Sequence, residues 1–338
     1  MRRLALFVAV AGAVLAPAAP ASAHGGDAPG ATAYRTRITG ISAPEKGLRI
    51  RTVEAGARLE LHNGTGHAVE VLGYSGEPYL DIRPDGTYQN VNSPAAYLNQ
   101  TLAGDTPVPP NADPTAMPQW RQISTGTTVR WHDQRTHWLS SGRPPEAIAD
   151  PGRVHRLRDW VVPLRVQVRT FELRGTLDWV PPPRAWLWWV GTALLGAGAS
   201  ALLVRRPRWV PPLALIGGLC PLLYATTQAT DGAAAPLALV LSGLLPLAAA
   251  YRHPPFFLAL SGAVLALFGG FAQLAALSAA VLPATGPAWL SRTAVMISLS
   301  VGAALCLAGL LRLRAAVPPR PPASHPAPAP SSQPVVPA

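Results

Sequence analysis

The stretch DWVPPPRAWLWW, residues 178–189, divides this chain into two regions of different chemistry. Asp178 is the last acidic residue before the junction, and Asp231 is the only acidic residue after Arg184. Three successive prolines make a stiff connection, and long apolar runs begin directly behind them. The tryptophans of this stretch favour the headgroup level of a bilayer, because an indole has a polar edge and an apolar body. The stretch therefore predicts the junction between a water-soluble domain and a membrane-embedded region.

Beyond this junction, apolar stretches alternate with loops that contain arginine. A span needs about 20 apolar residues, and candidate stretches lie at about 185–204, 209–227, 235–251, 255–282 and 292–311. The positive-inside rule places arginine-rich loops in the cytoplasm. If the N-terminal domain is exported, seven of the flanking arginines are cytoplasmic and two are not. We therefore predict a multi-pass cell-membrane protein with five transmembrane helices and a cytoplasmic C-terminus.

The two ends of the chain carry a targeting signal and a tail. Residues 1–23 predict a signal peptide, because two arginines precede a short apolar run that an A-x-A cleavage site closes. Cleavage there makes His24 the mature N-terminus. Residues 315–338 are rich in Pro, Ala and Ser and lack apolar periodicity, which predicts a disordered cytoplasmic tail.

The net charge of +11 suggests nucleic acid as a partner until it is divided along the chain. Residues 24–184 carry a net charge of only +2, whereas residues 185–338 carry +7. Most of the latter arginines lie in short loops beside apolar stretches, where they set membrane orientation. The charge therefore predicts no nucleic-acid partner.

Residues 24–180 predict an exported domain built from β-strands. Short runs, for example residues 58–61 (RLEL) and 128–131 (TVRW), place apolar residues at every second position, the period of a half-buried strand. Turn residues separate the runs, and residues 161–177 predict a final hairpin. This spacing predicts an all-β sandwich of immunoglobulin-like or cupredoxin-like type. The proline-rich residues 92–126 predict one long ordered loop rather than strands.

The densest group of chemically active side chains is WHDQRTHW, residues 131–138, at the end of a predicted strand. Imidazoles are good ligands for copper or zinc, so His132 and His137 are candidate metal ligands. His24 is a third candidate, because its α-amino group and ring can chelate a metal together. The alternative is structural: the first tryptophan packs in the core, the polar side chains make ordinary hydrogen bonds, and Arg135 pairs with an acid.

Two resemblances rest on these residues. The exported β-sandwich, His24 and the VRW strand before a histidine resemble copper-handling proteins of the CopC and CopD type, which implies copper as a cofactor. The chain departs from them in starting His-Gly-Gly after cleavage and in having no histidine inside its five apolar stretches. As a whole it resembles a family of actinobacterial membrane proteins whose exported domain bears a W-H-D-x-R-x-H-W run. That second likeness implies no particular activity.

A second group of side chains predicts a binding surface on the exported domain: Tyr74, Glu77, Tyr79, Asp133 and Arg135. The alternative is that these side chains cover a face of the sheet. No nucleophile, base and orienting group can be assembled from the sequence. We therefore predict no enzyme and no catalytic residues.

The apolar stretches themselves favour an anchor. No charged residue lies in their interiors, although carriers and proton relays usually need one. Gly262, Ala266 and Gly270 recur at every fourth residue, which favours close helix packing. Three functions remain: a binding or interaction module of the cell envelope, a copper-binding protein, and a transporter component. We favour the first, with the lipid bilayer and an envelope protein or small ligand as partners.

Overall fold

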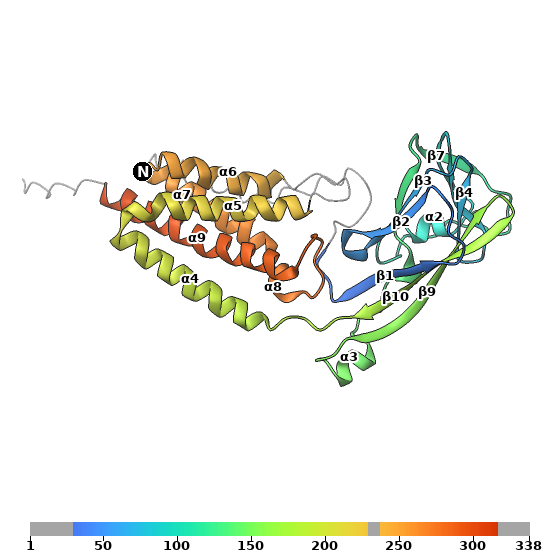
Figure 1. Cartoon of the computed structure of the whole chain (residues 1–338), viewed down its shortest axis with the longest axis horizontal. Coiled ribbons are helices and arrows are strands. Elements are labelled where there is room, and N and C mark those ends of the chain that lie inside the picture. The colour runs from blue at the N-terminus through green and yellow to red at the C-terminus, as the bar shows by residue number, and fades with distance from the viewer. Residues whose placement is uncertain (1–29, 229–236, 317–338) are drawn as a thin grey trace, which may run out of the picture. The chain divides into compact units, whose positions relative to one another are not determined.

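A computed structural model describes residues 30–228 and 237–316 of the chain (Figure 1). The predicted signal peptide, His24 and all but the first two residues of the predicted tail lie outside the described residues. The N-terminal part is an all-β domain of antiparallel sheets, and apolar helices follow it.

Ten antiparallel strands form two sheets in the N-terminal domain (Figure 1). The larger sheet has seven strands in the order β1 (Tyr34–Ile41), β10 (Arg169–Trp179), β9 (His155–Val166), β4 (Val69–Leu72), β5 (Pro78–Arg83), β6 (Gly86–Asn90) and β7 (Trp120–Ser124). The smaller sheet has the order β2 (Leu48–Val53), β3 (Arg58–Asn63) and β8 (Thr128–Trp131). The predicted final hairpin corresponds to β9 and β10, which pair along nearly their whole length.

The two sheets share one hydrophobic core. The smaller sheet contributes Leu59, Leu61 and Trp131, and the larger sheet contributes buried residues such as Leu80 and Leu164. The alternation seen in the sequence places these side chains inward, because successive side chains of a strand point to opposite faces. Burial of each such side chain stabilises the domain by about 1.5–3 kcal/mol. The core therefore holds the ends of β3 and β8, and the loop behind β8, in fixed positions.

The prediction of one long loop at residues 92–126 is wrong. The segment contains the short helix α2 (Ala95–Leu98) and the edge strand β7, which pairs with β6. All but the first residue of β7 are exposed, so its sequence carries no strong apolar alternation. The segment is a strand because it pairs with β6, and this pairing cannot be recognised from the sequence of residues 120–124 alone. A further short helix, α3 (Pro145–Ala149), precedes β9.

Four described helical stretches are long and apolar enough to cross a membrane: Ala185–Arg205, Pro207–Gln228, Pro255–Gln273 and Ala288–Ala315. The first contains α4, the second a 3-10 turn and α5 (Val210–Gln228), and the fourth α9. The third combines α7 (Pro255–Val264), the π-helix η5 (Leu265–Gly270) and a 3-10 turn, and it ends earlier than the predicted 255–282. The span predicted at 235–251 corresponds to α6 (Leu237–Tyr251), an apolar helix of 15 described residues that begins directly after the undescribed residues 229–236. The short helix α8 (Ala275–Ser278) follows the third stretch.

The glycine repeat packs helices closely, as the spacing predicts. A Cβ atom on Gly262 would lie 2.3 Å from the Cys306 backbone nitrogen, and one on Gly302 would lie 2.5 Å from the Ala266 nitrogen. A Cβ on Gly270 would lie 2.8 Å from the Leu299 Cα. The helical segment from residue 255 to residue 270 therefore touches α9 at backbone distance, as small-residue interfaces in membranes do.

Candidate functional site

The loop after β8 holds the residues 131–138 that the sequence singled out. Trp131 is buried in the core of the β-domain, with 3% of its surface exposed. A 3-10 turn, Gln134–Thr136, follows it, and the Asp133 side chain caps this turn by accepting from the Arg135 backbone nitrogen. The structural alternative for Trp131 and Arg135 is thus correct, whereas the two histidines differ from each other in their bonding.

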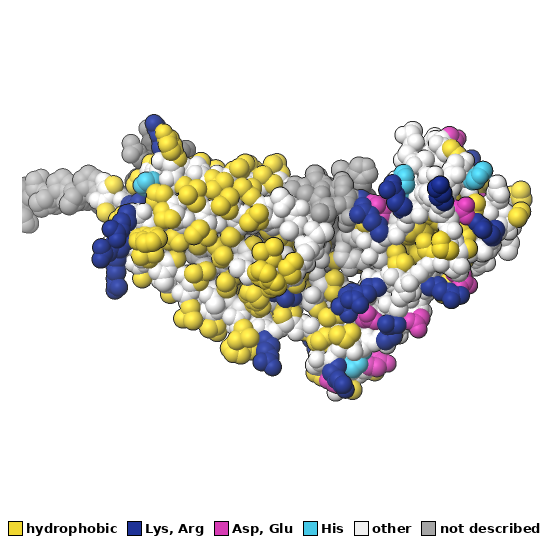
Figure 2. Space-filling model, viewed as in Figure 1, with side chains coloured by type: hydrophobic (Ala, Val, Ile, Leu, Met, Phe, Trp, Pro, Cys, Tyr) yellow, Lys and Arg dark blue, Asp and Glu magenta, His cyan; other side chains and the backbone are white. Residues whose placement is uncertain are grey.

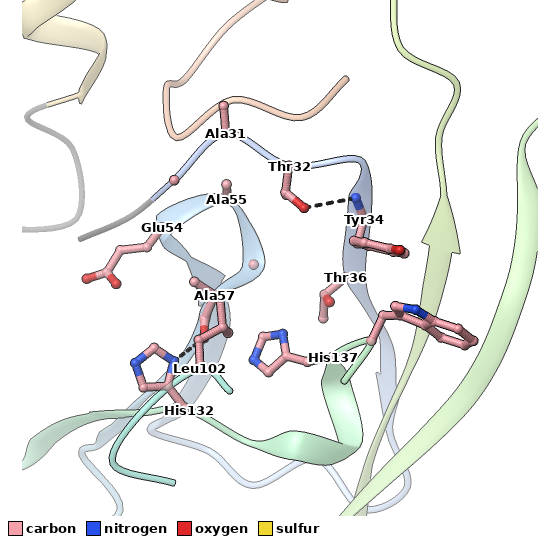
Figure 3. Close-up of a pocket in the computed structure, with 13 residues that line it drawn as sticks. Ala31, Thr32, Tyr34, Thr36, Glu54, Ala55, Ala57, Leu102, His132 and His137 are labelled. Atoms are coloured by element: carbon pink, nitrogen blue, oxygen red, sulfur yellow. Dashed lines mark hydrogen bonds between the residues drawn. The ribbon is translucent and has the colours of Figure 1, made fainter. Parts of the chain in front are cut away.

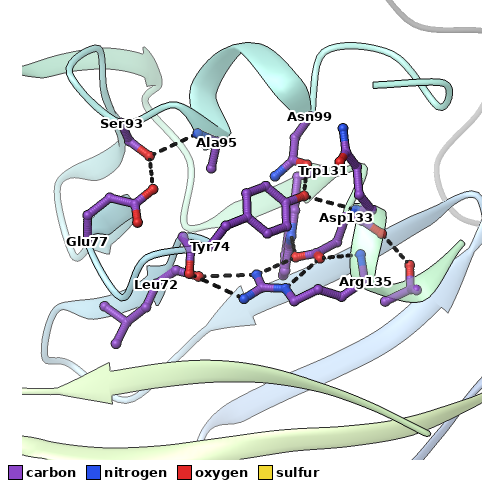
Figure 4. Close-up of polar contacts among 12 residues, drawn as sticks. Leu72, Tyr74, Glu77, Ser93, Ala95, Asn99, Trp131, Asp133 and Arg135 are labelled. Atoms are coloured by element: carbon purple, nitrogen blue, oxygen red, sulfur yellow. Dashed lines mark hydrogen bonds and ion pairs between the residues drawn. The ribbon is translucent and has the colours of Figure 1, made fainter. Parts of the chain in front are cut away.

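Asp133 and Arg135 form the centre of a buried polar network (Figure 4). The guanidinium donates to both carboxylate oxygens, from Nε at 2.8 Å and from Nη2 at 2.7 Å. The same Nη2 donates to the Leu72 carbonyl oxygen at 3.1 Å, and the Trp131 indole donates to Asp133 at 3.2 Å. Burial lowers the pKa of Arg135, but its bonds to Asp133 outweigh burial and leave the pKa raised. The Asp133–Arg135 pair ties the loop to the end of β4.

Tyr74 connects this network to α2. Its hydroxyl donates to Asn99 and accepts from the Gln134 backbone nitrogen at 3.0 Å (Figure 4). Its ring centroid lies 4.9 Å from the Arg135 guanidinium carbon, a cation–π contact. The loop that carries the histidines is therefore held in place from several directions by the protein itself.

Most of the residues that the sequence predicts as a binding surface are buried. Asp133 is 0% exposed, Tyr79 3% and Glu77 5%. Glu77 accepts from the Ser93 hydroxyl at 2.7 Å and packs against Gly73, where no Cβ would fit. Glu77 thus bonds the segment before α2, and Figure 4 shows it beside the network. The sequence pattern did not reveal that these side chains are buried.

A cavity of about 250 Å³ lies beside this loop (Figure 3). It is smaller than the sites of drug-sized ligands, which measure about 300–1,000 Å³. Aromatic rings form one wall, where Tyr34 and Trp138 stack with centroids 6.3 Å apart. His132 and His137 lie side by side in the lining, together with residues 54–57. The cavity thus gathers segments from four distant parts of the β-domain.

The two ring nitrogens of His132 are both engaged. Nδ1 lies 2.7 Å from the Ala57 carbonyl oxygen, and Nε2 lies 3.1 Å from the Arg58 Nε. A guanidinium can only donate and a carbonyl can only accept. His132 is therefore the tautomer that carries its proton on Nδ1, and its Nε2 lone pair faces Arg58. A metal ion would have to displace Arg58 to bind this nitrogen.

His137 lies in the cavity lining, and one of its ring nitrogens is unpaired among the described residues. Its Nε2 is buried and has no hydrogen-bond partner among the residues that the structure describes. Burial, with a smaller contribution from His132, lowers the pKa of His137 to about 4. The ring is therefore neutral near pH 7. The Ala57 backbone, whose carbonyl oxygen also accepts from His132, has a smaller opposite effect and favours the protonated form of the His137 ring.

Another part of the lining is a strained turn that the sequence pattern did not reveal. Glu54, Ala55 and Gly56 follow β2 with φ values of 56°, 60° and 88°. Left-handed backbone costs roughly 1–2 kcal/mol for a residue that has a Cβ atom. Strain of this kind concentrates at functional sites, where the surrounding structure holds it. The E-A-G sequence indicates a turn between two strands, but nothing in it indicates two strained residues in a cavity wall.

The Glu54 side chain is buried in this turn and is incompletely paired. Its Oε1 accepts from Arg58 at 3.3 Å and lies 4.0 Å from Arg130. Its Oε2 is buried and lacks a hydrogen-bond partner within the described residues. An unmade bond at a buried polar atom costs about 1–3 kcal/mol. Two such acceptors, Glu54 Oε2 and His137 Nε2, therefore belong to residues that line one cavity.

The described residues 30–228 and 237–316 contain no group of three or more His, Cys, Asp or Glu side chains arranged to hold a metal ion. His132 and His137 are close, with ring centroids 6.4 Å apart, but His24 lies outside the described residues. The fold thus brings two of the three candidate ligands together. Comparisons with protein-family models, curated proteins and solved structures find no match to this chain.

Proposed function

We propose that the chain is a membrane-anchored binding protein of the cell envelope, and that its β-domain binds a small molecule in the cavity beside His137. The His137 imidazole carries this proposal, because it lies in the cavity lining and its Nε2 has no hydrogen-bond partner among the described residues. The β-domain is an immunoglobulin-like or cupredoxin-like sandwich on the outer side of the membrane, and five spans anchor it. The role is binding rather than catalysis.

The chemistry of the lining selects the ligand. Glu54 Oε2 can only accept a hydrogen bond and the neutral His137 ring has one accepting nitrogen, so the proposed ligand donates hydrogen bonds. The stacked Tyr34 and Trp138 favour a flat or apolar face on the same molecule. The volume of about 250 Å³ limits the ligand to a small molecule. A hydroxyl or amine on a small aromatic or apolar body meets all three conditions.

A matched pair of probes tests this site in the full-length protein. Phenol donates a hydrogen bond and anisole does not, although both carry the same ring. We expect ligand-detected NMR to show that phenol binds about tenfold more tightly than anisole, the effect of one hydrogen bond of about 1.4 kcal/mol. His137→Phe should abolish the preference, and the exposed control His67→Phe should keep it. Equal binding of both probes to the wild-type protein would refute the proposal.

The side of the membrane needs its own experiment. Reporter fusions at Gly40 and Asn99, both within the β-domain, should report an extracytoplasmic location. Fusions just after Arg208 and at the C-terminus should report a cytoplasmic one. An intracellular reporter at Gly40 would overturn the topology and, with it, the envelope role.

Copper binding is the alternative function, and one observation favours it: two imidazoles lie in the same cavity lining. It requires His24 to approach them and Arg58 to release His132. Copper measured in the purified protein should then be stoichiometric and should be lost in His132→Ala. Copper that stays bound in this variant would rule out the predicted ligand set.

A further inference from the structure

One end of the helical region is strongly basic. Arg205 ends α4, Arg206 and Arg208 follow it, and Arg312 and Arg314 lie in the last turns of α9. The space-filling view shows blue side chains gathered at this end of the helices (Figure 2). No Asp or Glu occurs in the described residues 185–228 and 237–316, so no acidic side chain of these segments neutralises the cluster.

A groove of about 200 Å³ opens within this cluster. Its walls are apolar and come from the C-terminal ends of α4 and α9, and Arg312 is the one charged residue in the described lining. The other lining residues are Leu203, Val204, Pro207, Ala308, Leu311 and Ala315. Val204 and Leu311 are exposed on the helix surface, whereas Leu203 and Ala308 are buried. The groove thus runs from an apolar helix surface to a guanidinium.

Arg312 lines this groove, and one donor of its guanidinium is unpaired among the described residues. Its Nη2 is buried and has no hydrogen-bond partner in the part of the chain that the structure describes. A buried donor without an acceptor is unfavourable. The backbone cannot provide an attractive field for an anion here, because the C-terminal ends of helices carry partial negative charge. Attraction for an anion must therefore come from the arginine side chains.

We propose that this groove binds the phosphate headgroup of an anionic phospholipid. Guanidinium groups bind phosphate through two parallel hydrogen bonds, and basic pockets between transmembrane helices bind anionic headgroups. The apolar walls at Val204 and Leu311 accommodate the start of an acyl chain, which a free phosphate ion lacks. The site lies on helices of span length and does not depend on the ligand proposed for the β-domain.

Native mass spectrometry of the full-length protein in detergent tests the proposal. We expect phosphatidylglycerol to bind at least about tenfold more tightly than phosphatidylcholine. Arg312→Gln should reduce the affinity for phosphatidylglycerol about tenfold, and Arg312→Lys should restore part of it. Arg314→Gln removes the same charge two residues away and should change the affinity less than threefold.

Each contrary outcome has a clear meaning. Equal binding of the two lipids, or equal losses in Arg312→Gln and Arg314→Gln, would show that the groove does not recognise the headgroup. Inorganic phosphate at millimolar concentration should not displace the lipid, and displacement would overturn the assignment to a lipid. If Arg312→Gln fails to fold, the comparison of Arg312→Lys with Arg314→Lys replaces it, and only the Arg312 substitution should weaken binding.

Discussion

The imidazole rings of His132 and His137 lie edge to face, with centroids 6.4 Å apart, in the lining of one cavity. Their roles differ despite this proximity. His132 is bonded at both ring nitrogens, to Ala57 and to Arg58, whereas the Nε2 of His137 is buried without a described partner. His132 therefore holds the cavity wall, and His137 is the ring that we propose contacts a ligand.

Acidification should destabilise the protein through His137. Its pKa is about 4 in the folded state and 6.5 for an unperturbed histidine, so between these values the unfolded chain binds more protons. Stability contributed by the neutral ring is therefore complete above pH 6.5 and is lost progressively as the pH falls toward 4, by at most about 3 kcal/mol. Urea unfolding in micelles across this range measures the effect. In His137→Phe the pH dependence between 4 and 6.5 should shrink, and an unchanged slope would contradict the assignment.

Asp133→Asn should destabilise the β-domain by about 3–5 kcal/mol, because it leaves the Arg135 guanidinium buried without its counter-charge. The free energy of unfolding in urea gives the value. Asp159→Asn is the control, since Asp159 pairs with Arg156 with 79% of its side chain exposed. That substitution should cost no more than about 0.5 kcal/mol. Similar losses in the two variants would disprove the structural role of the buried pair.

Gly175→Ala should cost about 1–3 kcal/mol, because a Cβ there would lie 2.0 Å from the Trp160 ring and 2.3 Å from the Arg37 carbonyl oxygen. Gly40→Ala, in the neighbouring strand, is the matched control, as nothing lies within 4 Å of its added atom. Thermal melting distinguishes them. A melting temperature for Gly175→Ala equal to that of the wild-type protein would show that the close packing of Trp160 is incorrect.

Ala55→Gly should leave stability unchanged or raise it by up to about 1 kcal/mol, since glycine adopts a φ of 60° without the Cβ clash. Ala57→Gly should instead destabilise by about 0.5–1 kcal/mol, because Ala57 has an ordinary φ of −65°. The difference between the unfolding free energies of the two variants in urea measures the backbone strain at Ala55. If both lose stability equally, Ala55 is not strained.

Gly302→Val should disrupt the helical region, because any side chain at this position would enter the backbone of Ala266. Gly198→Val is the control within α4, where nothing lies within 4 Å of the added Cβ. Size-exclusion chromatography in detergent and thermal melting should show loss of the folded species only for Gly302→Val. Equal behaviour would mean that the helices do not approach at these glycines.

Local patterns in the sequence predicted a large part of the fold. Apolar alternation located β3, β8 and the β9–β10 hairpin, because a strand with one face in the core must repeat every two residues. The same reasoning missed β1 and β7, which are edge strands defined by their partners β10 and β6. Hydropathy located four helices of span length, because lipid tolerates only long apolar helices. The repeat at Gly262, Ala266 and Gly270 likewise predicted a helix contact that exists.

The sequence revealed only part of the candidate site. The run at residues 131–138 drew attention to His132 and His137, but it could not show that only His132 has a partner at its Nε2 within the described residues. That partner is Arg58, which lies 74 positions before His132. The cavity lining also includes the left-handed turn at Glu54 and Ala55, a backbone conformation that these residue types do not favour.

The sequence by itself determined the division into an aqueous β-domain and apolar helices. The preference of a residue for water or lipid depends on its own polarity, and the type of element depends on the spacing of apolar residues along the segment. Only the tertiary structure decided which polar atoms stay unpaired among the described residues, because His137, Glu54 and Arg312 each line a cavity or groove built from segments distant in the chain. Hydrogen bonding depends on distances of about 3 Å between specific atoms, and such distances exist only once the chain has folded.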